Sequence, residues 1–170
     1  MPRPYVMYPD ARLRAVAEPV DAVTDEVRAI WDEMLEAMYA MPGVGLAAPQ
    51  LGIQLRLAVL DCSPAKTEPV RLANPVLISA SDAFRKEVEG SPNLPGVADM
   101  VERPGEVSVR YLDEHGGEVE RSFTDLWSAS VQHQIDHLDG RLFFDRLTPA
   151  RRQRLLAKYR KAAKKQARAR

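Results

Sequence analysis

Two histidines and the residue after the first of them are the side chains whose types and spacing come closest to metal chemistry. His133 and His137 are four residues apart, so on a helix they face the same side and can hold one metal ion together. In zinc hydrolases with this spacing, the residue after the first histidine is the glutamate that activates the metal-bound water. Here it is Gln134, whose amide cannot take up a proton near neutral pH. The segment therefore has the form of a hydrolase helix without its general base.

A simpler interpretation of the pair stays open at this point. Two histidines on a half-buried helix also occur as core side chains with satisfied hydrogen bonds, and no metal is then involved. The other segments that the fold brings to this helix must decide between the two interpretations.

Three helices are predicted, and the second carries the histidine pair. Thr24 is a candidate cap for residues 25–40, where apolar side chains recur at helical spacing. Residues 125–138 form the second helix. Thr148, which a proline follows, predicts a third helix that continues to the C-terminus.

The middle of the chain is predicted to be rich in strands. Short runs of strand-forming residues occupy residues 55–61, 70–78, 106–112 and 118–123, with turn signals between them. Residues 41–50 are rich in glycine, alanine and proline, which favours a loop or irregular strand with an accessible backbone. A helix, then strands, then two helices indicates an α+β fold rather than an alternating parallel one.

Three short segments, in this order and with this internal spacing, give the sequence its resemblance to a known family. They are GVGLAAPQ at residues 43–50, EGSPNLPG at 89–96 and QHQIDH at 132–137. Together they resemble the three signature motifs of the peptide deformylases. The resemblance covers nearly the whole chain and also includes residues 8–14, 74–75, 101–104 and 138–140.

The resemblance implies both a fold and an activity. The implied fold has antiparallel sheets packed around a central helix that bears the His-Gln-x-x-His segment, plus a C-terminal helix. The implied activity is removal of the formyl group from the N-terminal methionine of nascent proteins with Fe²⁺ or Zn²⁺. By the same mapping, His133, His137 and Ser91 stand at the metal ligands, Gln134 at the base, and Gln50 at the residue that helps to bind the oxyanion.

Three positions depart from the family pattern in ways that matter chemically. Ser91 replaces a cysteine ligand, and a neutral hydroxyl is a poorer ligand for these metals than a thiolate. Pro92 stands where a backbone N–H would reach the developing oxyanion, and proline has no N–H. Gln134 replaces the glutamate base. The resemblance therefore predicts weak metal binding and hydrolysis that is strongly reduced or lost.

Other positions of the pattern are kept, and they predict a groove that still accepts a peptide. Gly43 and Gly45 have no side chains and let a peptide backbone lie close. Asp125 replaces a usual glycine, and Ala129 replaces a frequent arginine, at the entrance of the pocket. The residues expected to bind substrate are Gly43, Val44, Gly45, Arg103, Leu126, Ala129 and Ser130.

Three functions are compatible with this sequence. The first is a deformylase-like protein, impaired as an enzyme, that binds nascent peptides or ribosomes. The second is an active divergent metallohydrolase in which Glu89 or Asp99 completes the metal site. The third is an interaction protein that works only through its C-terminal helix.

The charge distribution separates the body of the chain from its end. The chain has 170 residues and no formal net charge, yet its last 20 residues contain ten basic and no acidic side chains. Such a tail predicts contact with ribosomal RNA through residues 150–170, and neither DNA nor a membrane is expected as a partner. A single cysteine, and no apolar run long enough to span a bilayer, favour the cytoplasm. We expect one domain at residues 1–147, to which a basic helix at 148–170 belongs.

Overall fold

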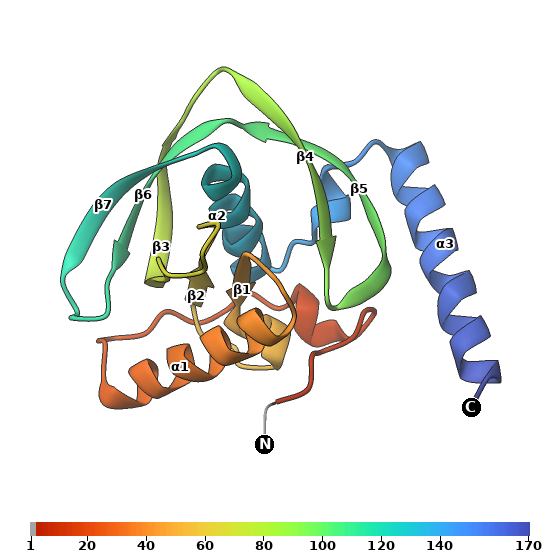
Figure 1. Cartoon of the computed structure of the whole chain (residues 1–170), viewed down its shortest axis with the longest axis horizontal. Coiled ribbons are helices and arrows are strands. Elements are labelled where there is room, and N and C mark those ends of the chain that lie inside the picture. The colour runs from red at the N-terminus through yellow and green to blue at the C-terminus, as the bar shows by residue number, and fades with distance from the viewer. Residues whose placement is uncertain (1–2) are drawn as a thin grey trace.

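The computed structural model describes residues 3–170 as three α-helices, three short 3-10 helices and two antiparallel sheets (Figure 1). The α-helices are α1 (Asp25–Ala40), α2 (Asp125–Leu138) and α3 (Pro149–Arg168), and the 3-10 helices are η1 (Ala11–Arg14), η2 (Ala48–Leu51) and η3 (Phe143–Arg146). The strands are β1 (Gly45–Ala47), β2 (Leu57–Leu60), β3 (Val70–Ala80), β4 (Phe84–Ser91), β5 (Leu94–Pro104), β6 (Glu106–Leu112) and β7 (Glu118–Thr124). The predicted α+β class with antiparallel sheets is confirmed.

The larger sheet has five strands in the order β1, β2, β3, β6 and β7, and all neighbours are antiparallel. The strands predicted at 70–78, 106–112 and 118–123 are confirmed as β3, β6 and β7 to within two residues at each end. The strand predicted at 55–61 is shorter, and the loop predicted at 41–50 contains β1 and the beginning of η2. Because β1 lies at the end of the sheet, its outer edge has no strand partner in this sheet.

The smaller sheet is a hairpin of β4 and β5, which the sequence pattern does not predict. Residues 84–91 carry four charged side chains and a glycine instead of the apolar alternation that marks a half-buried strand. Pairing nevertheless runs from Phe84 opposite Pro104 to Ser91 opposite Leu94, with a register shift between Gly90 and Ser91. The segment 89–96, identified above as a motif, therefore forms the tip of this hairpin.

Helix α2 lies between the five-stranded sheet and the hairpin (Figure 1). Ten of its 14 residues are buried, so this helix is surrounded by protein on most sides. Val131 belongs to the same buried apolar cluster as Leu60, Leu72 and Phe123 of the five-stranded sheet. The opposite side of α2 carries the two histidines toward β4, which is how the fold brings the third motif to the second.

Helix α1 fixes the loop that precedes β1. Thr24 caps this helix by accepting a hydrogen bond from Val27 N at 3.3 Å, as its sequence predicts. Trp31 is fully buried and its indole N–H donates to the carbonyl of Leu72 in β3. The helix ends at Ala40, so the packed helix fixes the start of the loop formed by residues 41–44.

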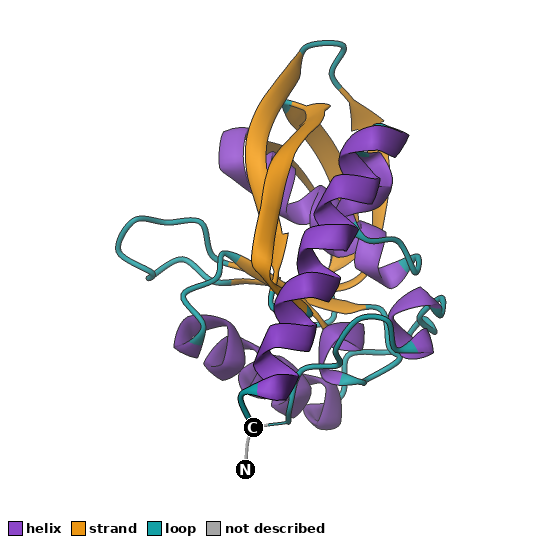
Figure 2. Cartoon of the chain, turned by 90° about the vertical axis from the view of Figure 1, so that its right-hand side faces the viewer, coloured by secondary structure: helices purple, strands orange, loops and turns teal. Residues whose placement is uncertain are grey.

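Helix α3 covers the hairpin with one face and leaves the rest exposed (Figure 2). The hydroxyl of Thr148 accepts from Arg151 N, which confirms the predicted cap. Leu155, Leu156 and Tyr159 are the buried residues of this helix and belong to the same apolar cluster as Val101 of β5. No helix within residues 3–170 is long and apolar enough to cross a membrane.

Candidate functional site

The two histidines of α2 converge on one point at the inner end of a pocket. His133 Nε2 and His137 Nε2 are 3.1 Å apart. This geometry follows from their spacing, because residues four apart lie above one another on a helix. His133 Nδ1 lies 2.8 Å from the Glu89 carboxylate, to which it donates. The two Nε2 atoms share one hydrogen bond, so one of them carries the proton that the other accepts.

His137 is a neutral residue in this environment. Its side chain is 1% exposed, and burial, followed by the repulsion of His133, holds its pKa well below the ordinary value of 6.5. Its second ring nitrogen, Nδ1, has no hydrogen-bond partner in the described chain. A buried nitrogen without a partner costs about 1–3 kcal/mol. The burial of His137 Nδ1 without a partner is therefore unfavourable for folding.

Glu89 anchors the histidine pair to the hairpin. Its carboxylate accepts two hydrogen bonds from Arg103 at 2.6 and 2.9 Å in addition to the one from His133. Burial alone would raise the pKa of Glu89, but the hydrogen bonds from His133 and Arg103 outweigh it and keep this pKa below its ordinary value. Glu89 is therefore ionised and fully engaged.

Arg103 lies on the far side of Glu89 from the pocket. It is 2% exposed and bridges Glu89 to Asp136, which in turn accepts two hydrogen bonds from Arg146. Arg103 was expected on the substrate side, but the structure places it in a buried ion network and it does not line the pocket. The sequence motif gives the position of this arginine along β5 and not the direction of its side chain, which explains the difference.

Ser91 belongs to a second network, at the tip of the hairpin. Its hydroxyl donates to Asn93 Oδ1 at 2.8 Å, and Gln50 Nε2 donates to the same oxygen at 2.8 Å. Gln50 Oε1 accepts from Ala47 N at 2.9 Å. Both polar atoms of the Gln50 amide are therefore held by neighbouring residues of the chain.

Gln134 takes the position of the base in the third motif, and its amide lies against the loop before β1. It is 4% exposed, and its Oε1 atom has no hydrogen-bond partner among residues 3–170. A Cβ atom on Gly45 would lie 2.5 Å from both Gln134 Nε2 and Ser130 Oγ. Ser130 Oγ also donates to the carbonyl of Val44 at 3.2 Å. A side chain at position 45 would therefore displace the side chains of Gln134 and Ser130.

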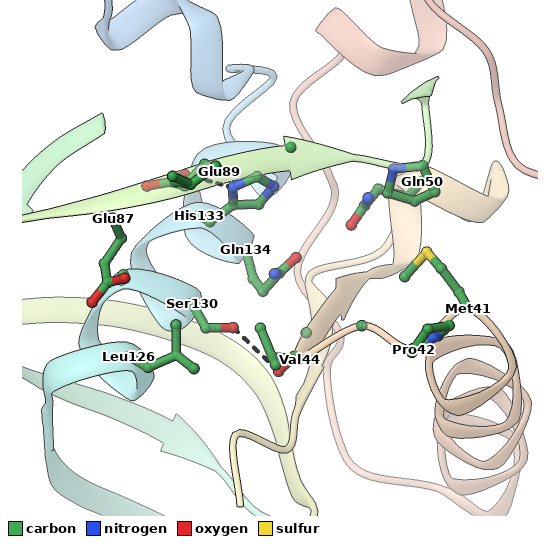
Figure 3. A pocket seen from close by; sticks show the side chains of 16 residues that line it. Met41, Pro42, Val44, Gln50, Glu87, Glu89, Leu126, Ser130, His133 and Gln134 are labelled. Atoms are coloured by element: carbon green, nitrogen blue, oxygen red, sulfur yellow. Dashed lines mark hydrogen bonds and ion pairs between the residues drawn. The ribbon is translucent and has the colours of Figure 1, made fainter. Parts of the chain in front are cut away.

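These residues surround a pocket of about 210 Å³ (Figure 3). Figure 3 shows Gln134 and His133 projecting from α2, with Glu89 beside His133 and Gln50 on the neighbouring segment. Both β1 and β4, which are edge strands, contribute to the lining. The lining residues are Met41, Pro42, Gly43, Val44, Gly45, Gln50, Glu87, Val88, Glu89, Gly90, Pro92, Leu126, Ala129, Ser130, His133 and Gln134.

The structure brings most of the predicted site residues to this one pocket. Of the residues expected to bind substrate, all except Arg103 line it. His137 and Ser91 lie behind the lining, in contact with His133 and Gln50 respectively. Asn93, which is fully buried at the centre of the Ser91 network, was not predicted from the sequence. In the sequence this asparagine looks like an ordinary turn residue, and only its place two residues after Ser91 could have pointed to it.

The residues present fit half of a metal site. Two nitrogens that each lie about 2.0–2.1 Å from a tetrahedral metal are roughly 3.3 Å apart, close to the observed 3.1 Å between the two Nε2 atoms. The third ligand does not fit, because the hydroxyl of Ser91 is neutral and already donates to Asn93. Within residues 3–170, no group of three His, Cys, Asp or Glu side chains is placed to hold a metal. This donor set does not suit a tightly bound divalent ion.

The alternative ligands are engaged elsewhere. Glu89 is bound by Arg103 and His133, as described above. Asp99 forms an ion pair with Arg151 of α3. Neither carboxylate faces the Nε2 atoms as a free ligand.

Comparison with known proteins places the chain in a family. The family model described as polypeptide deformylase matches residues 2–153. A peptide deformylase of Hydrogenovibrio crunogenus is 43% identical over 162 residues, which cover 95% of each chain. A peptide deformylase of Methylocella silvestris is 44% identical over 167 residues, covering 95% of this chain and 85% of the relative.

Solved structures agree with this result. A peptide deformylase from Legionella pneumophila superposes with a TM-score of 0.90 at 37% identity and 99% coverage of both chains. One from Ehrlichia chaffeensis, in complex with actinonin, superposes with a TM-score of 0.86 at 32% identity, covering 93% of this chain and 95% of the other. The chain therefore belongs to the polypeptide deformylase family, whose members use a divalent metal and remove the formyl group from N-terminal methionine.

Proposed function

We propose that this protein binds the N-terminal end of nascent chains in its pocket and has lost most or all of the hydrolytic activity of its family. The observation that carries this proposal is the pairing of Gln134, a residue that cannot act as a base, with a pocket whose lining still includes Gly43, Gly45 and Gln50. Peptide binding depends on the pocket, whereas hydrolysis depends on the positions that are substituted here.

The shape and chemistry of the pocket support peptide binding. Its outer part is lined by apolar side chains, among them Val44 and Leu126, which suit the side chain of methionine. The two edge strands on either side, β1 and β4, have outer edges available for a peptide that adds as an extra strand. An N-terminal peptide is thus the ligand class that fits both walls.

The three substituted positions support the loss of hydrolysis. A general base contributes about 10²- to 10⁴-fold to a rate, and an oxyanion donor about 10²- to 10³-fold. Gln134 lacks the first property, and Pro92 lacks the second because proline has no N–H. We propose that Fe²⁺ or Zn²⁺ is held weakly, since Ser91 supplies a hydroxyl instead of a thiolate. These losses need not multiply, but each is severe by itself.

An active, divergent metallohydrolase is the alternative, and the contacts of its required ligands argue against it. Glu89 would have to leave Arg103, and a buried guanidinium would then lack part of its counter-charge. Asp99 would have to leave the ion pair with Arg151 and turn inward. A turnover assay decides between the two proposals.

A second proposed function concerns the C-terminal helix, which would contact ribosomal RNA. Beyond Tyr159 every residue of α3 is exposed, and five of these side chains are basic. Such a surface supplies phosphate contacts without a competing acid. An interaction protein that uses only this helix would not need the pocket, so the two functions can be tested separately.

We further propose that the protein works in the cytoplasm, where nascent chains emerge, and that residues 148–170 belong to the same domain as residues 1–147. The packing of Leu155, Leu156 and Tyr159 into the cluster that contains Val101 supports this assignment. A separate helix would have no reason to bury these three side chains.

The first test measures turnover and binding on the same protein. Samples freshly loaded with Fe²⁺, Co²⁺ or Zn²⁺ are given a formyl-methionyl tripeptide, and we expect release of formate to be at least about 10²-fold slower than for ordinary enzymes, which turn over at about 1–10³ per second. Calorimetry with the same peptide should detect binding, and a formyl-aspartyl peptide serves as the control. Turnover in the ordinary range would contradict the proposed loss of hydrolysis. No detectable binding would contradict the proposal that the pocket binds a peptide.

The second test measures ribosome binding by co-sedimentation at low and high salt. Replacing Lys161, Lys164, Lys165 and Arg168 by glutamine should weaken binding and reduce its dependence on salt. The control replaces Lys86 and Arg110, two basic residues that are exposed on the strands, by glutamine. It should leave binding unchanged. Equal binding by both variants would remove the proposed contact through α3.

A further inference from the structure

Asn93 occupies the turn between β4 and β5 in an orientation that the surrounding backbone fixes. Its side chain is fully buried. Its Nδ2 atom donates to the carbonyl of Val6, in the N-terminal segment, and to the carbonyl of Gln50 at 3.3 Å. Two carbonyl acceptors can only be served by the NH₂ end of the amide. The oxygen end therefore cannot exchange places with the nitrogen.

The oxygen end of this amide faces the two residues that the family pattern assigns to chemistry. Asn93 Oδ1 receives the hydroxyl proton of Ser91 and one amide proton of Gln50, both at 2.8 Å. A carbonyl oxygen has two lone pairs, and both are used. Position 91 must therefore present a proton to a fixed acceptor.

We propose that Asn93 is the residue that determines which side chain position 91 accepts: it selects a neutral hydrogen-bond donor and disfavours an ionised thiolate. A thiolate has no proton to give, so its charge would face a carbonyl oxygen at hydrogen-bonding distance. The same asparagine accepts a hydrogen bond from the amide of Gln50, which also lines the pocket. The poor fit of this site to a divalent metal is thus a coupled property of positions 91 and 93.

This coupling has a consequence for reversal of the substitution. If Ser91 were the only residue that weakens the metal site, Ser91→Cys would restore a complete set of metal ligands, two imidazoles and one thiolate. With Asn93 in place, the charge of the restored thiolate is repelled by the Asn93 Oδ1 atom. Metal binding therefore stays weak. The inference goes beyond the proposed function, since it holds whether or not the pocket binds a peptide.

The test measures Co²⁺ binding by the absorption of tetrahedral cobalt with a thiolate ligand, and metal content after gel filtration. Three proteins are compared, Ser91→Cys, Asn93→Ser and the double variant, because a serine hydroxyl at position 93 can turn and donate. The control is Ser91→Cys with Asn74→Ser. Asn74 also makes two hydrogen bonds with the backbone, to Val20, so its loss destabilises the fold away from the site.

The double variant is expected to bind Co²⁺ about 10- to 100-fold more tightly than Ser91→Cys, the range over which residues behind metal ligands act. The control should bind like Ser91→Cys. Equal affinity of the double variant and Ser91→Cys, including no binding by either, would overturn the proposal.

A second measurement does not depend on the stability of the double variant. Ser91→Thr keeps the hydroxyl donor and should melt near the temperature of the wild type. Ser91→Ala leaves Asn93 Oδ1 with one donor fewer and should melt at least about 2–4 °C lower. If the alanine variant melts no lower than the threonine variant, position 91 needs no donor and the proposal is wrong.

Discussion

The two sides of the pocket are built on different principles. The side formed by α2 and the hairpin holds two buried polar networks, one of His133, Glu89 and Arg103 and one of Ser91 and Asn93. The loop side, residues 41–45, is mostly apolar, and it contacts the helix at Val44, which accepts from Ser130, and at Gly45. All three substitutions that affect chemistry lie on the first side. The difference supports the proposal that binding and hydrolysis depend on separate parts of this fold.

The largest effect is expected from rebuilding the polar side. Ser91→Cys, Pro92→Leu and Gln134→Glu together with Asn93→Ser supply a thiolate, an N–H and a base, and should raise Fe²⁺-dependent release of formate at least about 10³-fold over the wild type. The same triple variant with Asn93 kept is the matched control and should gain less. A gain of equal size in both proteins would show that Asn93 is not coupled to the metal site.

The next effect tests whether ion pairs, and not a metal, hold the polar side together. Arg103→Leu leaves Glu89 and Asp136 without their shared buried partner and should lower the free energy of unfolding by about 3–5 kcal/mol, measured in urea. Arg151→Ala breaks a pair with Asp99 in which both side chains are about one third exposed, and should cost no more than about 1 kcal/mol. Similar losses for both variants would contradict the distinction.

A substitution on the loop side should affect binding more than chemistry. Gly45→Ala places a Cβ atom against Gln134 and Ser130, so we expect about tenfold weaker binding of a formyl-methionyl peptide and a loss of about 1–3 kcal/mol in stability. Gly117→Ala is the control, because Gly117 does not line the pocket and its Cβ atom would make only ordinary contacts with Asp113. Unchanged affinity in Gly45→Ala would show that the loop does not contact the peptide.

The smallest effect is expected in how stability depends on pH. Asp61 accepts hydrogen bonds from Tyr39 and Ser63 near the loop side. Burial would raise the pKa of Asp61, but these hydrogen bonds outweigh it and lower this pKa. The stabilisation is therefore complete above the unfolded pKa of about 3.9 and is lost as the pH falls through the lower folded value. Asp61→Asn should be less stable than the wild type at pH 7, and this difference should shrink toward pH 2. A difference that does not change with pH would contradict this assignment.

Helices were predictable from the sequence because their signals are local. Thr24 and Thr148 mark caps, and α2 was predicted at residues 125–138, the bounds it has in the structure. The hairpin of β4 and β5 was not predictable, because its charged residues are satisfied by partners far along the chain, such as Asp125 for Arg85. Asp125 itself has φ of 54°, a conformation that glycine adopts without strain, which accounts for the glycine usual at this position.

The candidate site was predictable in its members and not in its contacts. The motifs and the rest of the family resemblance gave many of the lining residues by their positions along the chain. They did not give the direction of Arg103 or the role of Asn93, because hydrogen bonds to Val6, Gln50 and Asp136 depend on how separate elements meet. Such contacts arise only from the assembled fold.

The central claim, that the pocket binds a formylated N-terminus without cleaving it, is tested most directly by one NMR measurement. A formyl-methionyl peptide carrying ¹³C in its formyl group is mixed with the protein in the presence of Fe²⁺. We predict that the formyl signal shifts or broadens on binding and that the formate signal stays near its level without protein. Rapid growth of the formate signal, at the turnover of an ordinary enzyme of about 1–10³ per second, would contradict the account.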